Sequence, residues 1–345
     1  MSTITLPPPT DGAAATPRTA AAAPPILVAT DGREADASVL LTGERIGVRL
    51  GSAPQAVVVV EPIPVYDLVP ATQAPILEVE RAAALADLVR HQVIRETGDA
   101  WPTNVVVGPV ARAIVDVAAA RSASLVLLGV GRHRAVDRWL GTETALQVLR
   151  EANRPVLAVG PEADGIFRRA VVAVDFGPAS ARAAAIACRL LAPGGMLSLV
   201  HVKRGTEPRG PAAHVCGAHG LPYANELRQR LVAALRHGTT GCEECGATTG
   251  RADLAIGTAT LVGDPATELL DYAAQVGADL VAVGIHAGPT RKASGRRAVG
   301  RVATTLVRRA SDRLPACSIL ACAPPAAPIA ARMARDLFGA DGVPA

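Results

Sequence analysis

Hydrophobic residues form short unbroken runs, and longer segments with helical periodicity lie between them. The first run, at residues 26–29, leads into the polar residues Thr30, Asp31 and Gly32. A strand that is apolar at every position is typical of a parallel sheet covered on both faces. The same pattern farther along the first half predicts strands at 57–60, 105–107, 125–128 and 156–159 and helices at 35–50, 78–96, 111–120 and 142–152.

The second half of the chain repeats this pattern. Residues 171–177 copy the first strand and its acid–glycine ending, and 198–202, 280–284 and 318–320 match the second, fourth and fifth strands. Strands that alternate with helices predict crossover connections and a mostly parallel sheet. A repeat of this length indicates a duplicated domain. The sequence therefore predicts the α/β class, as two tandem, open-sheet, mostly parallel five-stranded α/β sandwiches of Rossmann-like form.

The boundaries follow from composition. Residues 1–24 are rich in Ala, Pro and Thr without periodicity, which predicts a disordered arm. Pro, Gly and charged residues cluster at 161–167, so the domains are expected at 25–161 and 168–324, with a tail at 325–345.

Composition and charge exclude several classes of protein. The chain has 345 residues, half of them hydrophobic, which is enough for a sizeable core and two domains. A net charge of +4 and 2% aromatic residues argue against nucleic-acid binding, which needs basic patches and stacking rings. No apolar stretch reaches the ~20 residues of a membrane span. The first residues also lack the pattern of a signal peptide, so a cytoplasmic location is expected.

The segment after the fourth predicted strand is the strongest candidate for a ligand site. In open parallel sheets, ligands bind beyond the carboxyl ends of the strands. Gly141 and Thr142 are expected to open the fourth helix, where free N–H groups and partial positive charge favour a phosphate. The alternative is a solvated basic loop in which Thr142 caps the helix. The segment contains Gly129, Gly131, Arg132, Arg134, Arg138, Gly141, Thr142 and Thr144.

Common catalytic and nucleotide motifs are missing from the sequence. There is no Walker loop, no three-glycine dinucleotide fingerprint after the first strand, and no Gly-x-Ser-x-Gly elbow. No nucleophile and base stand at a known spacing. The chain is therefore not expected to be an enzyme, beyond a slow ATPase at most.

With these features the chain resembles a tandem universal stress protein. Each half has the family's opening strand that runs into an aspartate, Asp31 or Asp175, and a glycine-rich loop before the fourth helix. The ATP-binding branch carries Gly-x2-Gly-x9-Gly-Ser/Thr. Gly131, nine residues and then Gly141-Thr142 fit its second part.

The resemblance implies a fold of the adenine nucleotide alpha hydrolase kind and a stress-response protein that binds ATP or a related adenine nucleotide, with Mg²⁺ as a candidate companion ion. It implies that Asp31 contacts the nucleoside, that the Val59 backbone meets the adenine, and that the glycines follow the ribose and phosphates. It also implies that the two domains pack as an internal pseudo-dimer, with a homodimer of chains as a further candidate. The candidate ligand residues are Thr30, Asp31, Gly32, Val59, Gly129, Gly131, Arg132, Gly141, Thr142 and Thr144.

The second copy departs from the motif. Arg301 stands at the Ser/Thr position and Ala303 at the next hydroxyl. A degenerate site that serves as a structural partner is expected there. An adaptor or scaffold of the same fold that binds no nucleotide is the alternative function for the whole chain.

A group of histidines and cysteines in the second copy suggests a further alternative, a regulatory module stapled by zinc. Four nitrogen or sulfur ligands make a tetrahedral zinc site, and solvent-facing loop residues are the competing interpretation. The group consists of His214, Cys216, His219, Cys242 and Cys245, whereas Cys188, Cys317 and Cys322 are predicted to be core thiols.

Overall fold

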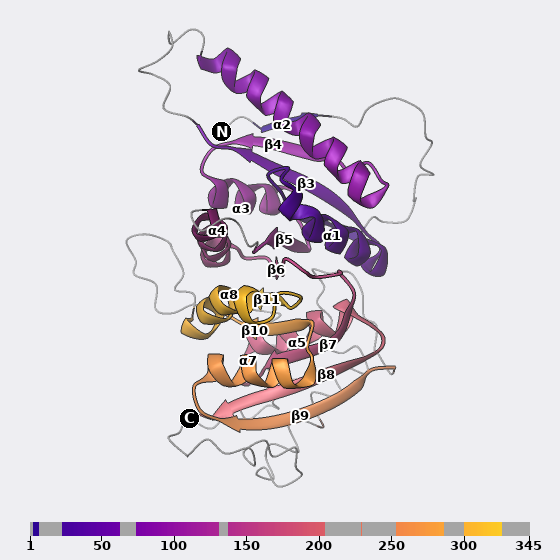
Figure 1. The fold of residues 1–345 in the computed structure, drawn as a ribbon, viewed down its shortest axis with the longest axis vertical. Coiled ribbons are helices and arrows are strands. Elements are labelled where there is room, and N and C mark those ends of the chain that lie inside the picture. The colour runs from indigo at the N-terminus through magenta and orange to yellow at the C-terminus, as the bar shows by residue number, and fades with distance from the viewer. Residues whose placement is uncertain are drawn as a thin grey trace.

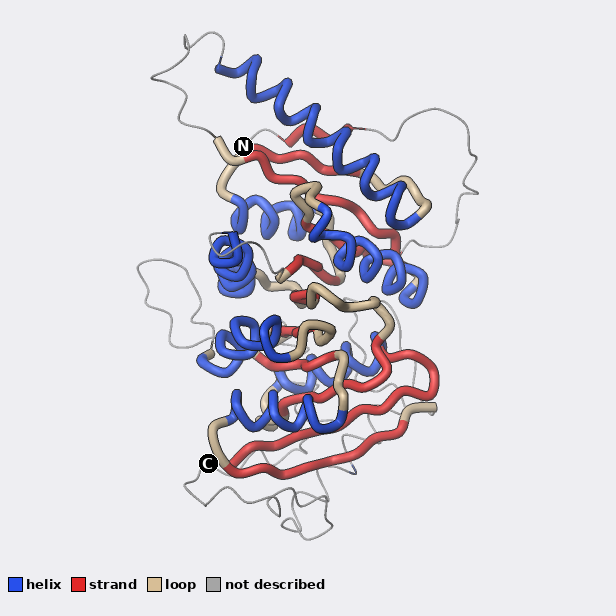
Figure 2. The backbone as a smooth tube through the Cα atoms, viewed as in Figure 1, coloured by secondary structure: helices blue, strands red, loops and turns tan. Residues whose placement is uncertain are grey.

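The computed structural model describes residues 3–6, 23–62, 74–130, 137–203, 229, 253–285 and 300–325. Within these residues the strands form one 11-stranded sheet, in the order β1-β4-β3-β2-β5-β6-β11-β10-β7-β8-β9. Two layered units of similar build follow one another along the long axis, and they meet at β6 and β11 (Figures 1 and 2). This arrangement confirms the predicted fold class.

The first half has a parallel sheet with helices on both faces. Ile26 and Val28 pack with α1 and α2, whereas Leu27 packs with α3 and α4, and all three side chains are fully buried. Burial on both faces explains why this strand is apolar at every position. The elements are β2 (Ala23–Ala29), a 3₁₀ turn (Glu34–Asp36), α1 (Ala37–Leu50), β3 (Ser52–Val60), α2 (Ala74–Thr97), β4 (Thr103–Val107), α3 (Val110–Ala120), β5 (Leu125–Gly129), α4 (Asp137–Glu151) and β6 (Val156–Val159).

The second half repeats this layout with its strand order running the opposite way along the sheet. Its helix α5 packs on the same face as α1 and α2, and α7 and α8 pack on the face of α3 and α4. The elements are β7 (Phe167–Ala173), α5 (Pro178–Leu190), β8 (Leu191–Lys203), β9 (Ala255–Val262), α7 (Pro265–Val276), β10 (Leu280–Gly284), α8 (Arg301–Arg313) and β11 (Ser318–Cys322).

The two halves are joined through a single sheet. Strands β6 and β11 pair antiparallel, with Leu157 opposite Leu320. Beside this pair the Gly160 N–H donates to Ser318 Oγ at 3.2 Å. A Cβ at Gly160 would lie 2.5 Å from the Pro315 carbonyl oxygen, so only glycine fits there. The halves therefore touch backbone to backbone at this point.

The N-terminal segment differs from the sequence prediction. β1 (Thr3–Leu6) pairs antiparallel with β4, although a disordered arm was predicted for 1–24. Its sequence alternates threonine with an aliphatic residue, which suits a strand. Without β1, the outer edge of β4 would present unpaired backbone groups. β2 also begins earlier than expected, at Ala23.

The described cysteines behave as predicted. Cys188, Cys317 and Cys322 are buried thiols. Burial raises the pKa of the Cys317 thiol to about 12, so this thiol stays protonated at neutral pH. None of the described helices combines the length and the apolar character that a membrane crossing requires.

Candidate functional site

The strand order reverses between β2 and β5. From β2 the chain moves outward to β3 and β4, and then returns to place β5 on the other side of β2. Such a switch point opens a crevice beyond the carboxyl ends of the two strands, where ligands bind in open α/β sheets. Ala29 pairs with Leu128, so the residues that follow them, Thr30 and Gly129, lie at one edge. The structure thus brings two separate sets of predicted ligand residues together.

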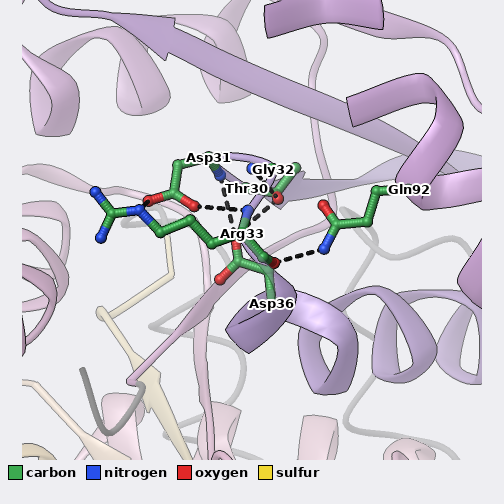
Figure 3. Close-up of polar contacts among 6 residues, drawn as sticks. All are labelled: Thr30, Asp31, Gly32, Arg33, Asp36 and Gln92. Atoms are coloured by element: carbon green, nitrogen blue, oxygen red, sulfur yellow. Dashed lines mark hydrogen bonds and ion pairs between the residues drawn. The ribbon is translucent and has the colours of Figure 1, made fainter. Parts of the chain in front are cut away.

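A tight turn follows β2, and hydrogen bonds fix its shape (Figure 3). Thr30 Oγ1 donates to Asp36 Oδ2 at 2.8 Å, and the Asp31 N–H donates to the same oxygen at 3.0 Å. The Gly32 N–H donates to Thr30 Oγ1 at 3.1 Å. Gly32 has φ +82°, a left-handed conformation that glycine adopts without strain. The turn is therefore ordered by its own polar groups.

Asp31 lies on the open side of this turn. Its carboxylate accepts from the Arg33 N–H at 3.1 Å and pairs with Arg33 Nε at 3.1 Å. Both side chains are more than half exposed. An exposed ion pair of this kind contributes little, about 0–1 kcal/mol, so a ligand can displace it at low cost.

Asp36 is a site residue that the sequence analysis missed. It closes the 3₁₀ turn, and its side chain is 8% exposed. Its Oδ1 lies 3.4 Å from the position that a Cβ would take at Gly129, the last residue of β5. Burial raises the pKa of this carboxyl to about 6, and the nearby Asp31 carboxylate adds to the rise. No spacing motif marks Asp36, because its neighbour Gly129 is far away in the sequence.

Helix α2 supports the turn from the side. The Gln92 side-chain amide Nε2 donates to the Arg33 carbonyl oxygen at 2.5 Å. Gln92 is 3% exposed, and its Oε1 has no hydrogen-bond partner. One acceptor beside the turn is thus buried and unsatisfied, which is rare in folded proteins.

The start of α4 corrects the sequence prediction. The helix begins at Asp137, so Gly141 and Thr142 lie in its second turn and do not open it. Free N–H groups belong to the first four residues of a helix. An acidic residue followed by good helix formers favours the earlier start. The prediction that Gly141 and Thr142 open the helix is therefore wrong, whereas their part in ligand binding stays a prediction.

Glu143, next in the same helix, faces the other half of the protein. Its carboxylate pairs with Arg150 at 3.1 Å and with Arg308 of α8 at 3.5 Å. Thr142 and Thr144 are half-buried on this helix.

The remaining candidates divide into described and undescribed residues. Val59 lies one residue before the end of β3, is half-buried and pairs with Val106 of β4. Among the described residues, no group of three His, Cys, Asp or Glu side chains is placed to hold a metal ion. The candidates outside the described residues are Gly131, Arg132, His214, Cys216, His219, Cys242 and Cys245.

The corresponding turn of the second half is built differently. Phe176 takes the place of Gly32, with φ +65°, and its ring packs on His201 with centroids 4.8 Å apart. His201 Nδ1 lies 2.8 Å from the Val174 carbonyl oxygen. Arg301, which opens α8, pairs with Asp264 at 3.0 Å. An aromatic side chain thus lies where the first half has only a glycine.

Comparisons with known proteins agree with the resemblance noted in the sequence. The model of the universal stress protein family matches residues 23–160 and 166–312. A solved universal stress protein from Archaeoglobus fulgidus DSM 4304 is 18% identical, with a TM-score of 0.54 over 87% of this chain and 96% of that one. A protein of unknown function from Pseudomonas aeruginosa PAO1 is 17% identical, with a TM-score of 0.53 over 91% and 96% of the two chains.

A smaller solved structure is the universal stress protein from Archaeoglobus fulgidus in complex with dAMP. It is 21% identical and covers 38% of this chain and 94% of its own, with a TM-score of 0.27. No curated protein matches the sequence significantly.

Proposed function

The chain belongs to the universal stress protein family, and on that premise we propose that its N-terminal half binds ATP or a related adenine nucleotide in the crevice between β2 and β5. The second half serves mainly as its structural partner. We further propose a cytoplasmic stress-response role in which binding, rather than turnover, carries the signal.

The observation that carries this proposal is the contrast between the two turns. In the first half, Gly32 has no side chain of its own, and the Asp31 carboxylate makes exposed contacts with Arg33, the N–H bond and the ion pair. In the second half, the Phe176 ring packs on His201 at the same place. The ligand is therefore assigned to the first half, whose turn carries no aromatic side chain.

The start of α4 supports the competing function, an adaptor without nucleotide. Because Gly141 and Thr142 lie inside the helix, their N–H groups face no phosphate. A site that relies on the turn after β2 would then hold the nucleoside part more strongly than the phosphates.

The first test is direct. Purified protein is denatured, and released adenine nucleotide is identified by chromatography at 260 nm. Calorimetry then measures the affinity of the intact chain for ATP, AMP and adenosine. Failure of every adenine compound to bind would leave the adaptor as the better function.

Matched variants locate the site. Asp31 and Asp175 follow equivalent strands, and each accepts a hydrogen bond from the backbone N–H two residues on. Asp31→Ala is expected to weaken binding at least tenfold, whereas Asp175→Ala leaves it unchanged. The reverse result would assign the ligand to the second half.

A further inference from the structure

We propose that Asp36 contacts the bound ligand directly, with Oδ1 accepting a hydrogen bond from an O–H or N–H group of the nucleoside. This inference rests on the proposed function of the same crevice. It adds a specificity-determining residue that lies outside the glycine and threonine motif.

The two carboxylate oxygens of Asp36 have different surroundings. Oδ2 accepts both hydrogen bonds of the turn, from Thr30 Oγ1 and from the Asp31 N–H. Oδ1 accepts none from the residues that the structure describes, and Figure 3 shows it directed away from the turn. It lies beside Gly129, at the strand end that borders the switch point. A free acceptor is therefore placed where a ligand is expected.

The exposure of Oδ1 suits a ligand contact. Asp36 as a whole is 8% exposed, but its Oδ1 is not a fully buried atom, so a ligand can reach it. The turn holds the side chain through Oδ2, which leaves Oδ1 as a fixed acceptor at the surface. A hydrogen bond to a charged group of this kind is among the stronger ones.

The second half shows that the fold does not need this carboxylate. Ser180 stands at the equivalent position, and its Oγ donates to the Gly177 carbonyl oxygen at 3.0 Å. Its backbone nitrogen lies against Gly284, the counterpart of Gly129. The same strand, turn and helix thus form with a small hydroxyl whose hydrogen bond stays within the turn. The carboxylate of Asp36 is an addition specific to the first half.

The charge of Asp36 defines the chemistry of the contacted group. A phosphate oxygen would be repelled there, so the contact is with a neutral donor: a ribose hydroxyl or the amine of the base. Among the described residues, the titratable group facing Asp36 is the Asp31 carboxylate of the same turn, which is paired with Arg33. Gly129 from β5 and Val39 from α1 are uncharged.

A donor on Oδ1 favours the ionised carboxylate, and this gives the contact a pH signature. Because burial raises the pKa of Asp36 to about 6, adenosine binding is expected to release a proton near that pH. Affinity for adenosine then increases as the pH rises from 5 to 7.5, by about tenfold at most. Adenosine has no phosphate, so the ligand does not titrate in this range.

The experiment measures four probes by calorimetry: adenosine, 2′-deoxyadenosine, 3′-deoxyadenosine and purine riboside, which lacks the amine. The wild type should bind the analogue without the contacted group about tenfold more weakly than adenosine. In Asp36→Ser, which copies the second half, that ratio should fall to about one and the pH dependence should disappear. Asp36→Asn provides the second variant, because it keeps the shape of the side chain but removes its charge.

The outcomes separate the two proposals. If no probe binds the wild type, the proposed function fails and this inference fails with it. If the wild type binds and the ratios and pH profile persist in Asp36→Ser or Asp36→Asn, only the contact with Asp36 is overturned. For one analogue, the affinity of adenosine relative to that analogue should fall to about one in the variants. The group that this analogue lacks is the hydroxyl or amine that faces Oδ1.

Discussion

Single residues at equivalent positions distinguish the two halves. Gly32 and Phe176 both adopt left-handed backbone conformations, with φ +82° and +65°. Glycine does so without cost, whereas a residue with a Cβ is strained by about 1–2 kcal/mol. The ring contact between Phe176 and His201 offsets part of that strain, since such pairs contribute about 0.5–1.5 kcal/mol. The same left-handed turn thus carries a glycine beside Leu88 of α2 in one half and an aromatic contact in the other.

The buried carboxyl of Asp36 predicts how stability depends on pH. Burial raises its pKa from 3.8 to about 6, so between these values the folded chain holds this proton more tightly than the unfolded chain. This contribution to stability is complete below the unfolded pKa and is lost as the pH rises through about 6. Between pH 4 and pH 7.5 the loss amounts to about 2 kcal/mol.

Asp36→Asn removes this titration, so urea unfolding at both pH values tests it. Relative to the wild type, the variant should gain about 2 kcal/mol between pH 4 and pH 7.5. Titrating groups away from this turn contribute equally to both proteins and cancel in the comparison, whereas the Asp31 carboxylate is coupled to Asp36 and its change is part of the measured difference. A difference between the two proteins that stays constant with pH would show that Asp36 ionises normally in the folded state.

At the scale of elements, the sequence predicted most strands and helices but not all of their ends. Apolar runs identified β2 to β6 because both faces of the sheet are covered. The segment β1 was missed because an alternation over only four residues, beside a stretch rich in Ala and Pro, is too short to identify a strand, and its partner β4 is distant in the sequence. The start of α4 was misplaced because Gly141 and Thr142 resemble a helix-capping pair, although the helix already begins at Asp137.

The candidate site was only partly predictable for a similar reason. Thr30, Asp31, Gly32 and Gly129 could be found because each follows a recognisable strand. Asp36 and Gln92 could not, because their roles depend on contacts with Gly129 and Arg33 that only the fold creates.

The position of Gly141 inside α4 gives a prediction for this helix. Glycine in a helix interior is less favourable than alanine by about 1 kcal/mol. Gly141→Ala should therefore raise the free energy of unfolding by up to that amount. Gly300 provides the control, since it is the N-cap of α8, where glycine is preferred to alanine. Gly300→Ala should leave stability unchanged or lower it slightly, and a loss in Gly141→Ala would place that residue outside the helix.

At the scale of the whole molecule, the two halves form one sheet and are linked on both of its faces. β6 pairs with β11, and Glu143 of α4 pairs with Arg308 of α8 on one face. The buried Arg182 side chain of α5, which packs on the other face, donates from Nη1 to the Asn153 carbonyl oxygen of the first half at 3.5 Å. Gly165 in the connecting segment packs against the backbone of Thr42 in α1. These contacts couple the folding of the halves.

Gly160→Ala tests that coupling at its tightest point. The new methyl group would lie 2.5 Å from the Pro315 carbonyl oxygen and 2.7 Å from that of Cys317, both rigid backbone atoms. The overpacking should lower the free energy of unfolding by about 1–3 kcal/mol. Both tryptophans, Trp101 and Trp139, belong to the first half of the sequence, so their fluorescence reports that half, while circular dichroism reports both.

In the wild type the two signals should change together along a urea gradient, because the junction makes unfolding cooperative. In Gly160→Ala they should separate, as the strained junction opens and each half unfolds at its own urea concentration. Gly257→Ala is the matched control: it lies in β9 of the same sheet, and an added Cβ there meets no atom within 4 Å. The prediction is contradicted if both signals of Gly160→Ala change together at the urea concentration of the wild type. The β6–β11 junction would then accommodate a methyl group and would not be what couples the halves.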